Sequence, residues 1–372
     1  MKNRLRTVIF IQPRFPHYRE SFFRRLFDDE RISGILYFSP MTPEVNSGQE
    51  QIYQWAKTIG SIWSLPLGLG WQSGALAVPI RCEDILVISG NPRLLSNLVV
   101  AVKGKLRGAT IIWWSHYWSA NSKSWRFSLR LLLMRMADAL MFYTDEEVTH
   151  YHEKTRRKDS RVIFALNNGI ELEPVRAARS LRYRLSQRPR DLLFIGRITS
   201  KSQLELLIEA LAQPSADFTL DVIGDGPEAA NSRLLAKRLG VADRIVWHGE
   251  STDEALIATV ANSCKVFVYP GAVGLSLIHG LAYGLPAIVH DNRWKHMPEI
   301  AALRPGVNGA TFRYGDVTSL AEVIRGILDR PDGLERMSKE ALNTTEKSFN
   351  TADMASRFVS ALTSLEPNLK LR

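Results

Sequence analysis

The chain has 372 residues, of which 45% are hydrophobic, enough for two packed domains of ordinary size. No run of about 18 apolar residues occurs, so the sequence shows no membrane-spanning pattern. The formal charge of +10 is unevenly divided. Residues 1–172 carry 23 Lys and Arg against 15 Asp and Glu (+8), and residues 173–372 carry 25 against 23 (+2). A basic first half favours an anionic partner. Without zinc-finger spacing, an RNA-binding aromatic motif or a basic tail, an anionic membrane surface is favoured and nucleic acid is not expected.

The N-terminus and the cysteines indicate the compartment. The segment MKNRLRTVIFIQPRF has a short apolar run that Arg14 closes, which is typical of a first strand rather than of a signal peptide. Cys82 and Cys264 lie far apart beside apolar segments, and we expect buried, reduced thiols. We therefore expect a cytoplasmic protein, and the basic first half favours peripheral association with the inner face of the cell membrane.

Short apolar runs alternate with helical patterns along the first half. They predict strands at Val8–Ile11, Ile35–Phe38, Ile85–Ile88, Thr110–Trp114, Ala139–Tyr143 and Val162–Ala165. Such alternation is typical of a doubly wound parallel sheet. The region Pro40–Pro79 has little periodicity, and we expect irregular structure there.

The segment Lys123–Asp138 has the pattern of an amphipathic helix. Its apolar stripe is Trp125, Leu129, Leu132 and Met136, and its basic face is Lys123, Arg126 and Arg130. Two interpretations stay open: the stripe packs on the core and the basic face is solvated, or the helix docks on acidic lipid.

A charged stretch without a strand pattern, Glu171–Arg190, predicts a linker, and a second series of strands and helices begins at Leu192. We therefore expect one domain at residues 1–172, a second at residues 173–350 and a C-terminal helix within residues 351–372.

The second half contains a strand–turn–helix unit suited to an anion. The strand Val266–Tyr269 is followed by Pro-Gly and by Gly274-Leu275-Ser276, which opens an apolar helix. Unpaired N–H groups and the positive end of a helix favour phosphate. Glycines at 271 and 274 let the backbone approach it closely.

Two similar units precede it. The strand at Asp191–Ile195 ends in Gly196-Arg197, and Lys201 follows in the same loop. A later strand runs into the turn Gly224-Asp225-Gly226-Pro227-Glu228, and a further strand ends in His248-Gly249. The order and spacing of these motifs resemble glycosyltransferase family 4. The resemblance implies the GT-B fold, with two Rossmann-like doubly wound parallel-sheet domains that face a central cleft. It also implies an N-terminal acceptor-binding domain, a C-terminal domain that binds the nucleotide sugar, and a last helix that packs back on the first domain.

The resemblance assigns roles to individual residues. Arg197 and Lys201 match the cations that clamp the donor diphosphate, where they would stabilise the charge that develops as the sugar leaves. The remaining donor-binding candidates are Gly196, Asp225, His248, Gly271, Gly274, Leu275 and Ser276.

One departure from the family pattern concerns its two glutamates. Gly271 stands where the first is expected, near the donor sugar, and His279 stands where the second is expected, at the ribose hydroxyls. A neutral imidazole can accept one such hydrogen bond and donate another. The departure puts the identity of the donor in question more than the class of reaction.

In the first half, His116 follows a predicted strand, and family 4 members often place a catalytic histidine there. Four polar residues near predicted strand ends are candidates for the acceptor side: Arg14, His17, Arg19 and Asn91.

The resemblance predicts a retaining hexosyltransferase that moves a sugar from a nucleotide diphosphate, UDP- or GDP-linked, to a hydroxyl of a lipid-linked bacterial polysaccharide or oligosaccharide, such as lipopolysaccharide or capsule. No Asp-x-Asp pair occurs, so we expect neither a metal site nor a further cofactor. Two alternatives stay open: a sugar-nucleotide epimerase of the same fold, and a non-catalytic partner of another transferase that binds sugar nucleotide. The sequence leaves the sugar, base, acceptor, linkage and oligomeric state open.

Overall fold

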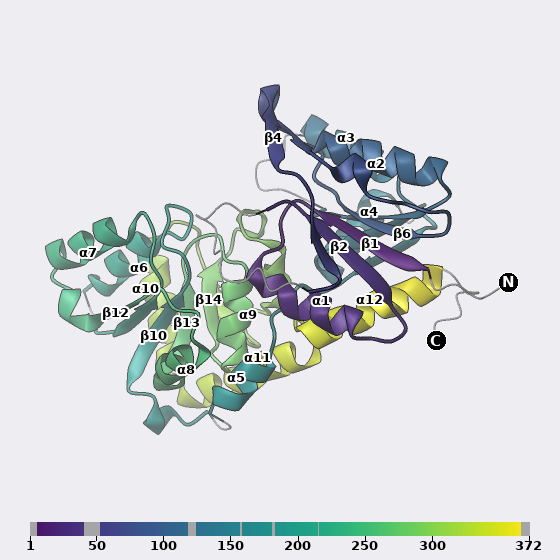
Figure 1. Ribbon diagram of the computed structural model, residues 1–372. Helices are drawn as coiled ribbons and strands as arrows, with labels where there is room; N and C mark the ends of the chain where they lie inside the picture. The colour runs from purple at the N-terminus through teal and green to yellow at the C-terminus, as the bar shows by residue number, and fades with distance from the viewer. Residues whose placement is uncertain are drawn as a thin grey trace. The chain divides into compact units, whose positions relative to one another are not determined.

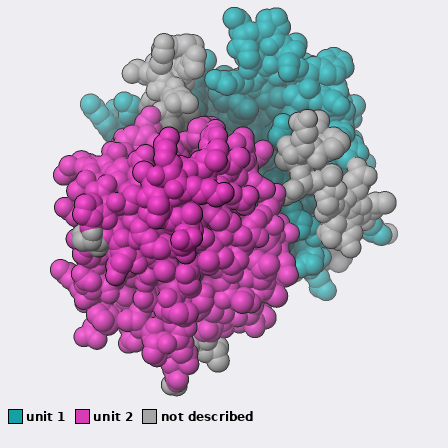
Figure 2. Space-filling view, turned by 90° about the vertical axis from the view of Figure 1, so that its left-hand side faces the viewer, with its two compact units in different colours: residues 1–166, 351–372 teal, residues 167–350 magenta. Residues whose placement is uncertain are grey.

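The computed structural model describes residues 6–40, 53–117, 124–156, 158–180, 183–214 and 216–365, with side chains except at residues 124–127. The chain forms two compact units (Figure 2). Unit 1 comprises residues 1–166 and 351–372, and unit 2 comprises residues 167–350. Among the described residues, no helix is both long enough and apolar enough to cross a membrane.

Unit 1 contains a seven-stranded parallel sheet in the order β3-β2-β1-β6-β7-β8-β9 (Figure 1). Its strands are β1 (Thr7–Gln12), β2 (Ser33–Phe38), β3 (Ala56–Thr58), β6 (Ile85–Ser89), β7 (Thr110–Trp114), β8 (Ala139–Phe142) and β9 (Val162–Ala165). The six strands expected from the sequence are confirmed. The region expected to be irregular is partly ordered, because it holds β3 and an antiparallel hairpin, β4 (Ile62–Leu65) and β5 (Leu69–Gln72).

Helices cover both faces of this sheet. The helices are α1 (Glu20–Phe27), α2 (Leu95–Leu106), α3 (Ser124–Met134), α4 (Asp145–Lys154) and α12 (Thr351–Leu365), with short 3-10 turns η1 (His17–Arg19), η2 (Pro66–Gly68) and η3 (Ala75–Ala77). Side chains of α2, α3 and α4 share one core cluster, and side chains of α1 and α12 share the other. A parallel sheet whose strands alternate with helices has two apolar faces, so it needs a layer of helices on each face.

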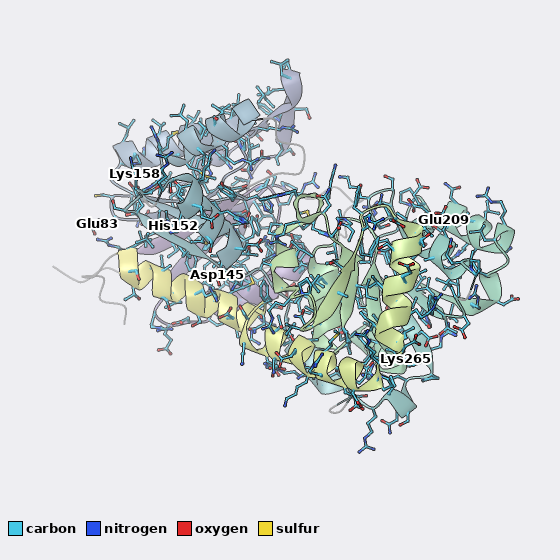
Figure 3. All side chains as sticks on the ribbon, turned by 180° about the vertical axis from the view of Figure 1, so that it is seen from behind. Glu83, Asp145, His152, Lys158, Glu209 and Lys265 are labelled. Atoms are coloured by element: carbon cyan, nitrogen blue, oxygen red, sulfur yellow. The ribbon has the colours of Figure 1, made fainter. Side chains whose placement is uncertain are left out.

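The C-terminal helix α12 belongs to unit 1, where it packs on α1 and β9. Phe358 is fully buried, with its ring centroid 5.3 Å from that of Phe10. Arg357 donates a 3.0 Å hydrogen bond from Nη1 to Oδ1 of Asp145, which Figure 3 labels beside this helix.

Unit 2 contains a six-stranded parallel sheet in the order β12-β11-β10-β13-β14-β15. Its strands are β10 (Arg190–Ile195), β11 (Leu220–Ile223), β12 (Ile245–Gly249), β13 (Cys264–Tyr269), β14 (Ala287–His290) and β15 (Gly309–Phe312). Its helices are α5 (Glu173–Ala178), α6 (Leu204–Leu211), α7 (Ala229–Arg238), α8 (Glu254–Ser263), α9 (Leu275–Ala282), α10 (Val317–Leu328) and α11 (Pro331–Lys347), with 3-10 turns η4 (Leu185–Gln187), η5 (Ala242–Arg244), η6 (Arg293–Lys295) and η7 (Pro298–Ala302). The order of strands reverses between β10 and β13, and ligands of such sheets bind at the carboxyl ends of the strands at this point.

Three local expectations are wrong. Cys82, expected to be buried, is exposed, whereas Cys264 is buried. The expected linker instead includes α5, which packs on α8 and buries Val175. In α3, Leu129 and Leu132 are exposed and do not form the inward stripe, while Met134 is buried. The run of apolar residues in this helix allows more than one inward face, and tertiary packing selects it. Lys123 lies outside the described residues, as do the side chains of Trp125 and Arg126.

Candidate donor site

The loops that follow β10 and β11 lie against each other in unit 2. Gly196 N donates to Ile223 O at 3.0 Å, and Ile198 N donates to Asp225 O at 2.8 Å. A Cβ atom on Gly224 would lie 2.0 Å from the carbonyl oxygen of Gly196. A side chain at position 224 would therefore displace the loop that carries Arg197.

The loop that carries Lys201 is held against the turn between β13 and α9. Ala272 N donates to Lys201 O at 2.9 Å, and a Cβ atom on Gly271 would lie 2.0 Å from the same oxygen. A Cβ atom on Gly196 would lie 3.3 Å from Ser276 Oγ, in the first turn of α9. The backbone on either side of Arg197 and Lys201 is thus fixed beside the N-terminus of α9.

In this arrangement, two positively charged side chains remain available to a ligand. Arg197 and Lys201 are exposed, and among the described residues neither side chain has a hydrogen-bond or ion-pair partner. Gly274 is the N-cap of α9 and provides no side-chain cap. Two cations beside the N–H groups of Leu275 and Ser276 can bind a diphosphate.

Two histidines that the sequence did not single out hold the turn in place. His296 Nδ1 accepts from Val273 N at 3.3 Å, and its Nε2 lies 2.9 Å from the carbonyl oxygen of His290. The His290 ring stacks on it at 3.7 Å. Burial lowers the pKa of His290 to about 3 and that of His296 to about 4, so both rings are neutral near pH 7.

A third residue missed by the sequence is Glu299. A Cβ atom on Gly274 would lie 3.7 Å from its Oε2, and its Oε1 accepts a hydrogen bond from Asn168. The carboxylate is buried near the start of α9. No spacing rule links Glu299 to this helix, because the contact depends on how η7 folds back.

His279 has a protein partner. Its Nε2 lies 2.9 Å from Oε1 of Glu254, at the start of α8, and Tyr283 also donates to this oxygen. Burial would raise the pKa of Glu254, but its hydrogen bonds with His279 and Tyr283 hold it below the usual range. Against an ionised carboxylate, Nε2 carries the proton and Nδ1 is left as an acceptor.

Two of the expected donor residues are engaged in local contacts. Asp225 is exposed and accepts a 2.7 Å hydrogen bond from Gly226 N within its own turn. His248 Nε2 lies 2.7 Å from Oδ1 of Asp221, whose other oxygen accepts from Arg190 Nε.

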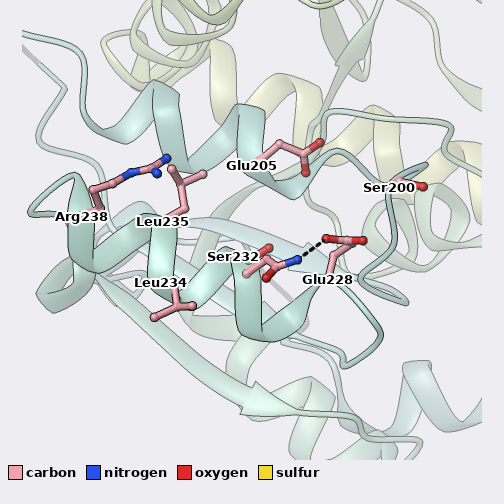
Figure 4. A pocket seen from close by; sticks show the side chains of 8 residues that line it. Ser200, Glu205, Glu228, Ser232, Leu234, Leu235 and Arg238 are labelled. Atoms are coloured by element: carbon pink, nitrogen blue, oxygen red, sulfur yellow. Dashed lines mark hydrogen bonds between the residues drawn. The ribbon is translucent and has the colours of Figure 1, made fainter.

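A pocket of about 730 Å³ lies beside these loops, between the start of α6 and α7 (Figure 4). Its lining includes Glu205, Glu228 and Ser200. Burial, with the charges of Glu209 and Glu228, raises the pKa of Glu205. The carboxylates of Glu205 and Glu228 disfavour an anion, so we expect a diphosphate at the start of α9 rather than in this pocket.

In unit 1, His116 lies in an aromatic and cationic cluster. Its ring stacks on Tyr143 at 4.0 Å, and the Arg19 guanidinium lies 4.3 Å from the ring centroid of Trp114. Arg130, expected on a solvated face, instead is half-buried and donates from Nη1 to the carbonyl oxygen of Tyr117 at 3.2 Å. Burial and the charges of Arg130 and Arg19 lower the pKa of His116 well below its usual range.

The other acceptor-side candidates are exposed. His17 Nε2 lies 3.9 Å from Glu20 Oε2, and Asn91 Oδ1 accepts from Arg93 N at 3.1 Å. Arg14 follows β1. The structure therefore brings Arg19 and His116 into one cluster through Tyr143, with Arg19 5.4 Å from the Tyr143 ring. Within the described ranges, no group of three or more His, Cys, Asp or Glu could hold a metal ion.

Two parallel α/β units of this kind define the GT-B fold of glycosyltransferases. Two solved structures illustrate the likeness: a lipopolysaccharide outer core galactosyltransferase, WaaB, in its apo form, and Alr3699/HepE of Anabaena with UDP and glucose. The first has a TM-score of 0.70 at 15% identity and covers 96% of this chain and 99% of its own. The second has a TM-score of 0.69 at 14% identity, and the match covers 96% of this chain and 100% of the HepE chain.

The family model matches part of unit 2. Residues 180–344 match the family model described as glycosyl transferases group 1. N-acetyl-alpha-D-glucosaminyl L-malate synthase of Bacillus anthracis is 23% identical over 178 residues, 47% of this chain and 46% of that protein. Lipopolysaccharide 1,6-galactosyltransferase of Salmonella typhimurium is 24% identical over 136 residues, 35% of this chain and 37% of that protein. The matches thus span less than half the length of these curated relatives.

The buried histidines predict a pH dependence of stability. Unfolded His290 and His296 titrate near 6.5, whereas the folded residues titrate at about 3 and 4. The unfolded chain therefore binds more protons, and stability falls as pH drops from 6.5 towards 4. We expect His290→Phe to reduce this loss, measured as the melting temperature at several pH values. An unchanged slope would show that His290 does not contribute.

Gly271→Ala tests the contact between the loops. Because the new methyl group would meet the carbonyl of Lys201, we expect a loss of stability of about 1–3 kcal/mol and weaker nucleotide binding by calorimetry. Gly326→Ala in α10, with open space around the new Cβ, is the matched control. It should be neutral or stabilising by up to about 1 kcal/mol. Equal effects of the two substitutions would contradict the assignment.

Proposed function

We propose that this chain is a retaining, metal-independent glycosyltransferase of family 4. It transfers a sugar from a nucleotide diphosphate to a hydroxyl of a bacterial polysaccharide or oligosaccharide, lipid-linked as in lipopolysaccharide or capsule. One observation carries the proposal. Contacts of Gly271 and Ala272 with the Lys201 backbone, and of Gly196 with α9, hold the two loops that carry Arg197 and Lys201 beside a helix N-terminus.

The cations and the helix end would act on the leaving diphosphate. Negative charge grows on its oxygens as the sugar departs, and groups fixed there beforehand stabilise that charge without reorganisation. In a retaining reaction, the leaving phosphate takes the proton of the acceptor hydroxyl on the same face. The remaining task of the protein is to position the reactants, to which His116 would contribute as a neutral hydrogen-bond donor.

The comparisons support the donor and acceptor parts of this proposal. The Anabaena structure contains UDP and glucose, which favours a UDP-linked donor here. Two matched relatives are lipopolysaccharide galactosyltransferases, which favours a bacterial polysaccharide acceptor.

A panel of UDP- and GDP-sugars, assayed for release of free nucleotide with and without EDTA, tests the proposal. A transferase releases nucleotide, and faster when acceptor is added. An epimerase converts the sugar nucleotide without release, and a non-catalytic partner binds it unchanged. Loss of activity in EDTA with recovery in Mn²⁺ or Mg²⁺ would overturn metal independence.

We expect Arg197→Ala and Lys201→Ala each to slow transfer by about 10²–10³. Both side chains are exposed, so their removal should leave the melting temperature unchanged. Steady-state kinetics and thermal unfolding of each variant check this. A fully active variant of normal stability would exclude that residue from the diphosphate site.

We further propose that His279 accepts from a ribose hydroxyl through Nδ1 while Glu254 holds its ring. His279→Ala should raise the KM for the donor with a smaller effect on kcat. His279→Glu alone would set two carboxylates against each other, so adding Glu254→His should recover donor binding by restoring the pair. Calorimetric titration of nucleotide into these three variants measures the coupling. Unchanged affinity in His279→Ala would mean that the ribose is held elsewhere.

A further inference from the structure

The positive charge of the first half is concentrated in one segment. Residues 51–137 contain ten Lys and Arg and two acidic residues, Glu83 and Asp84, and this net +8 equals that of the whole first half. Asp84 is buried and accepts from Arg81 N, whereas Glu83, labelled in Figure 3, is exposed. The segment builds the β4–β5 hairpin, α2 and α3, and it contains no acid at all between residues 85 and 137.

The same segment exposes large apolar side chains. On α2, the stripe Val99, Val102 and Leu106 is 43%, 46% and 84% exposed. On the hairpin, Trp63 is 59% exposed and Leu67 is 96% exposed. A surface helix in water normally has a polar outer face, but α2 is apolar outside as well as towards the core, where Val100 and Ala101 are buried.

The hairpin and α2 form one surface. Gly70 N donates to Arg93 O at 2.8 Å, and Gln72 N donates to Ser96 Oγ at 3.0 Å, so β5 is joined to the start of the helix. Figure 1 shows the hairpin projecting from unit 1, and α2 belongs to the helical layer that shares its core cluster with α3. On α3, Leu129 and Leu132 are also exposed.

Cations flank this apolar surface at both ends of α2. Arg93 is exposed before the helix, and Arg107 is exposed after it. Arg107 Nη1 donates to Ile80 O at 3.1 Å, which holds its guanidinium beside the apolar stripe. Lys105 pairs with Asp138 at 3.0 Å.

We propose that the outer face of α2 and the β4–β5 hairpin dock on an anionic lipid bilayer. Apolar side chains enter the boundary between headgroups and acyl chains, and cations pair with the phosphates above them. Nucleic acid would match the charge but would gain nothing from Leu106, Val102 or Leu67. Docking would bring the proposed transferase to a lipid-linked acceptor. Only this purpose of docking rests on the proposed function.

Sedimentation with phosphatidylcholine vesicles, with and without phosphatidylglycerol, tests the proposal on the full chain. We expect binding to the mixed vesicles and weak binding to phosphatidylcholine alone. Leu106→Ser and Leu67→Ser should each weaken binding by about tenfold or more, since a leucine side chain is lost from the bilayer. Arg107→Gln should weaken it by about fivefold. On α7 of unit 2, Leu234→Ser is the matched control, because Leu234 is 64% exposed, and it should change nothing.

Three results would overturn the docking surface. The first is that the parent protein does not bind mixed vesicles, and the second is that it binds both kinds of vesicle equally. The third is that Leu234→Ser and Leu106→Ser weaken vesicle binding equally. A dimer in analytical ultracentrifugation that Leu106→Ser dissociates would assign the surface to a second copy instead. Nucleotide binding by the same variants separates this proposal from the proposed function, because a docking variant should bind nucleotide as the parent does.

Discussion

The candidate donor site depends on one close contact, between the carbonyl of Lys201 and the backbone of Gly271 and Ala272. Loops after β10 and β13 meet there because these strands are neighbours at the point where the strand order reverses. The contact has no room for a Cβ atom at position 271, so glycine is a steric requirement. It also explains the departure from the family pattern at this position, since a glutamate would displace the loop that carries Lys201.

Around this contact, unit 2 uses buried polar groups to hold the start of α9. His296 is neutral and bridges Val273 and His290, while Glu299 lies under Gly274 and binds Asn168. Buried groups of this kind need hydrogen-bond partners, so each fixes its neighbours in place. The helix end thereby keeps its position with little help from the exposed cations, whose side chains are left for an anionic ligand.

Unit 1 separates its charges into two settings. Arg19 and Arg130 lie around His116, where burial and their charges lower the pKa of the imidazole, whereas Arg93 and Arg107 are exposed at the two ends of α2. No acidic residue occurs at positions 85–137, so the outer face of α2 carries no carboxylate. A carboxylate on the outer face of α2 would repel phosphate headgroups. Beside His116, the buried carboxylate of Glu147 lies 3.9 Å from Nδ1 and accepts a hydrogen bond from Tyr117 N.

The sequence by itself determined the class of fold and the positions of the loops that are proposed to bind phosphate. Apolar runs of strand length mark the strands, and glycine with a nearby cation marks each loop, because these signals are local. It also located Arg197, Lys201 and Gly274, which lie at strand or helix ends. Tertiary structure alone decided the partners of residues distant in sequence. Glu254 meets His279, and Glu299 reaches Gly274, through packing that no local pattern encodes. The inward face of α3 and the membership of α5 in unit 2 were likewise decided by packing, since an apolar run or a charged helix fits more than one arrangement until its neighbours are in place.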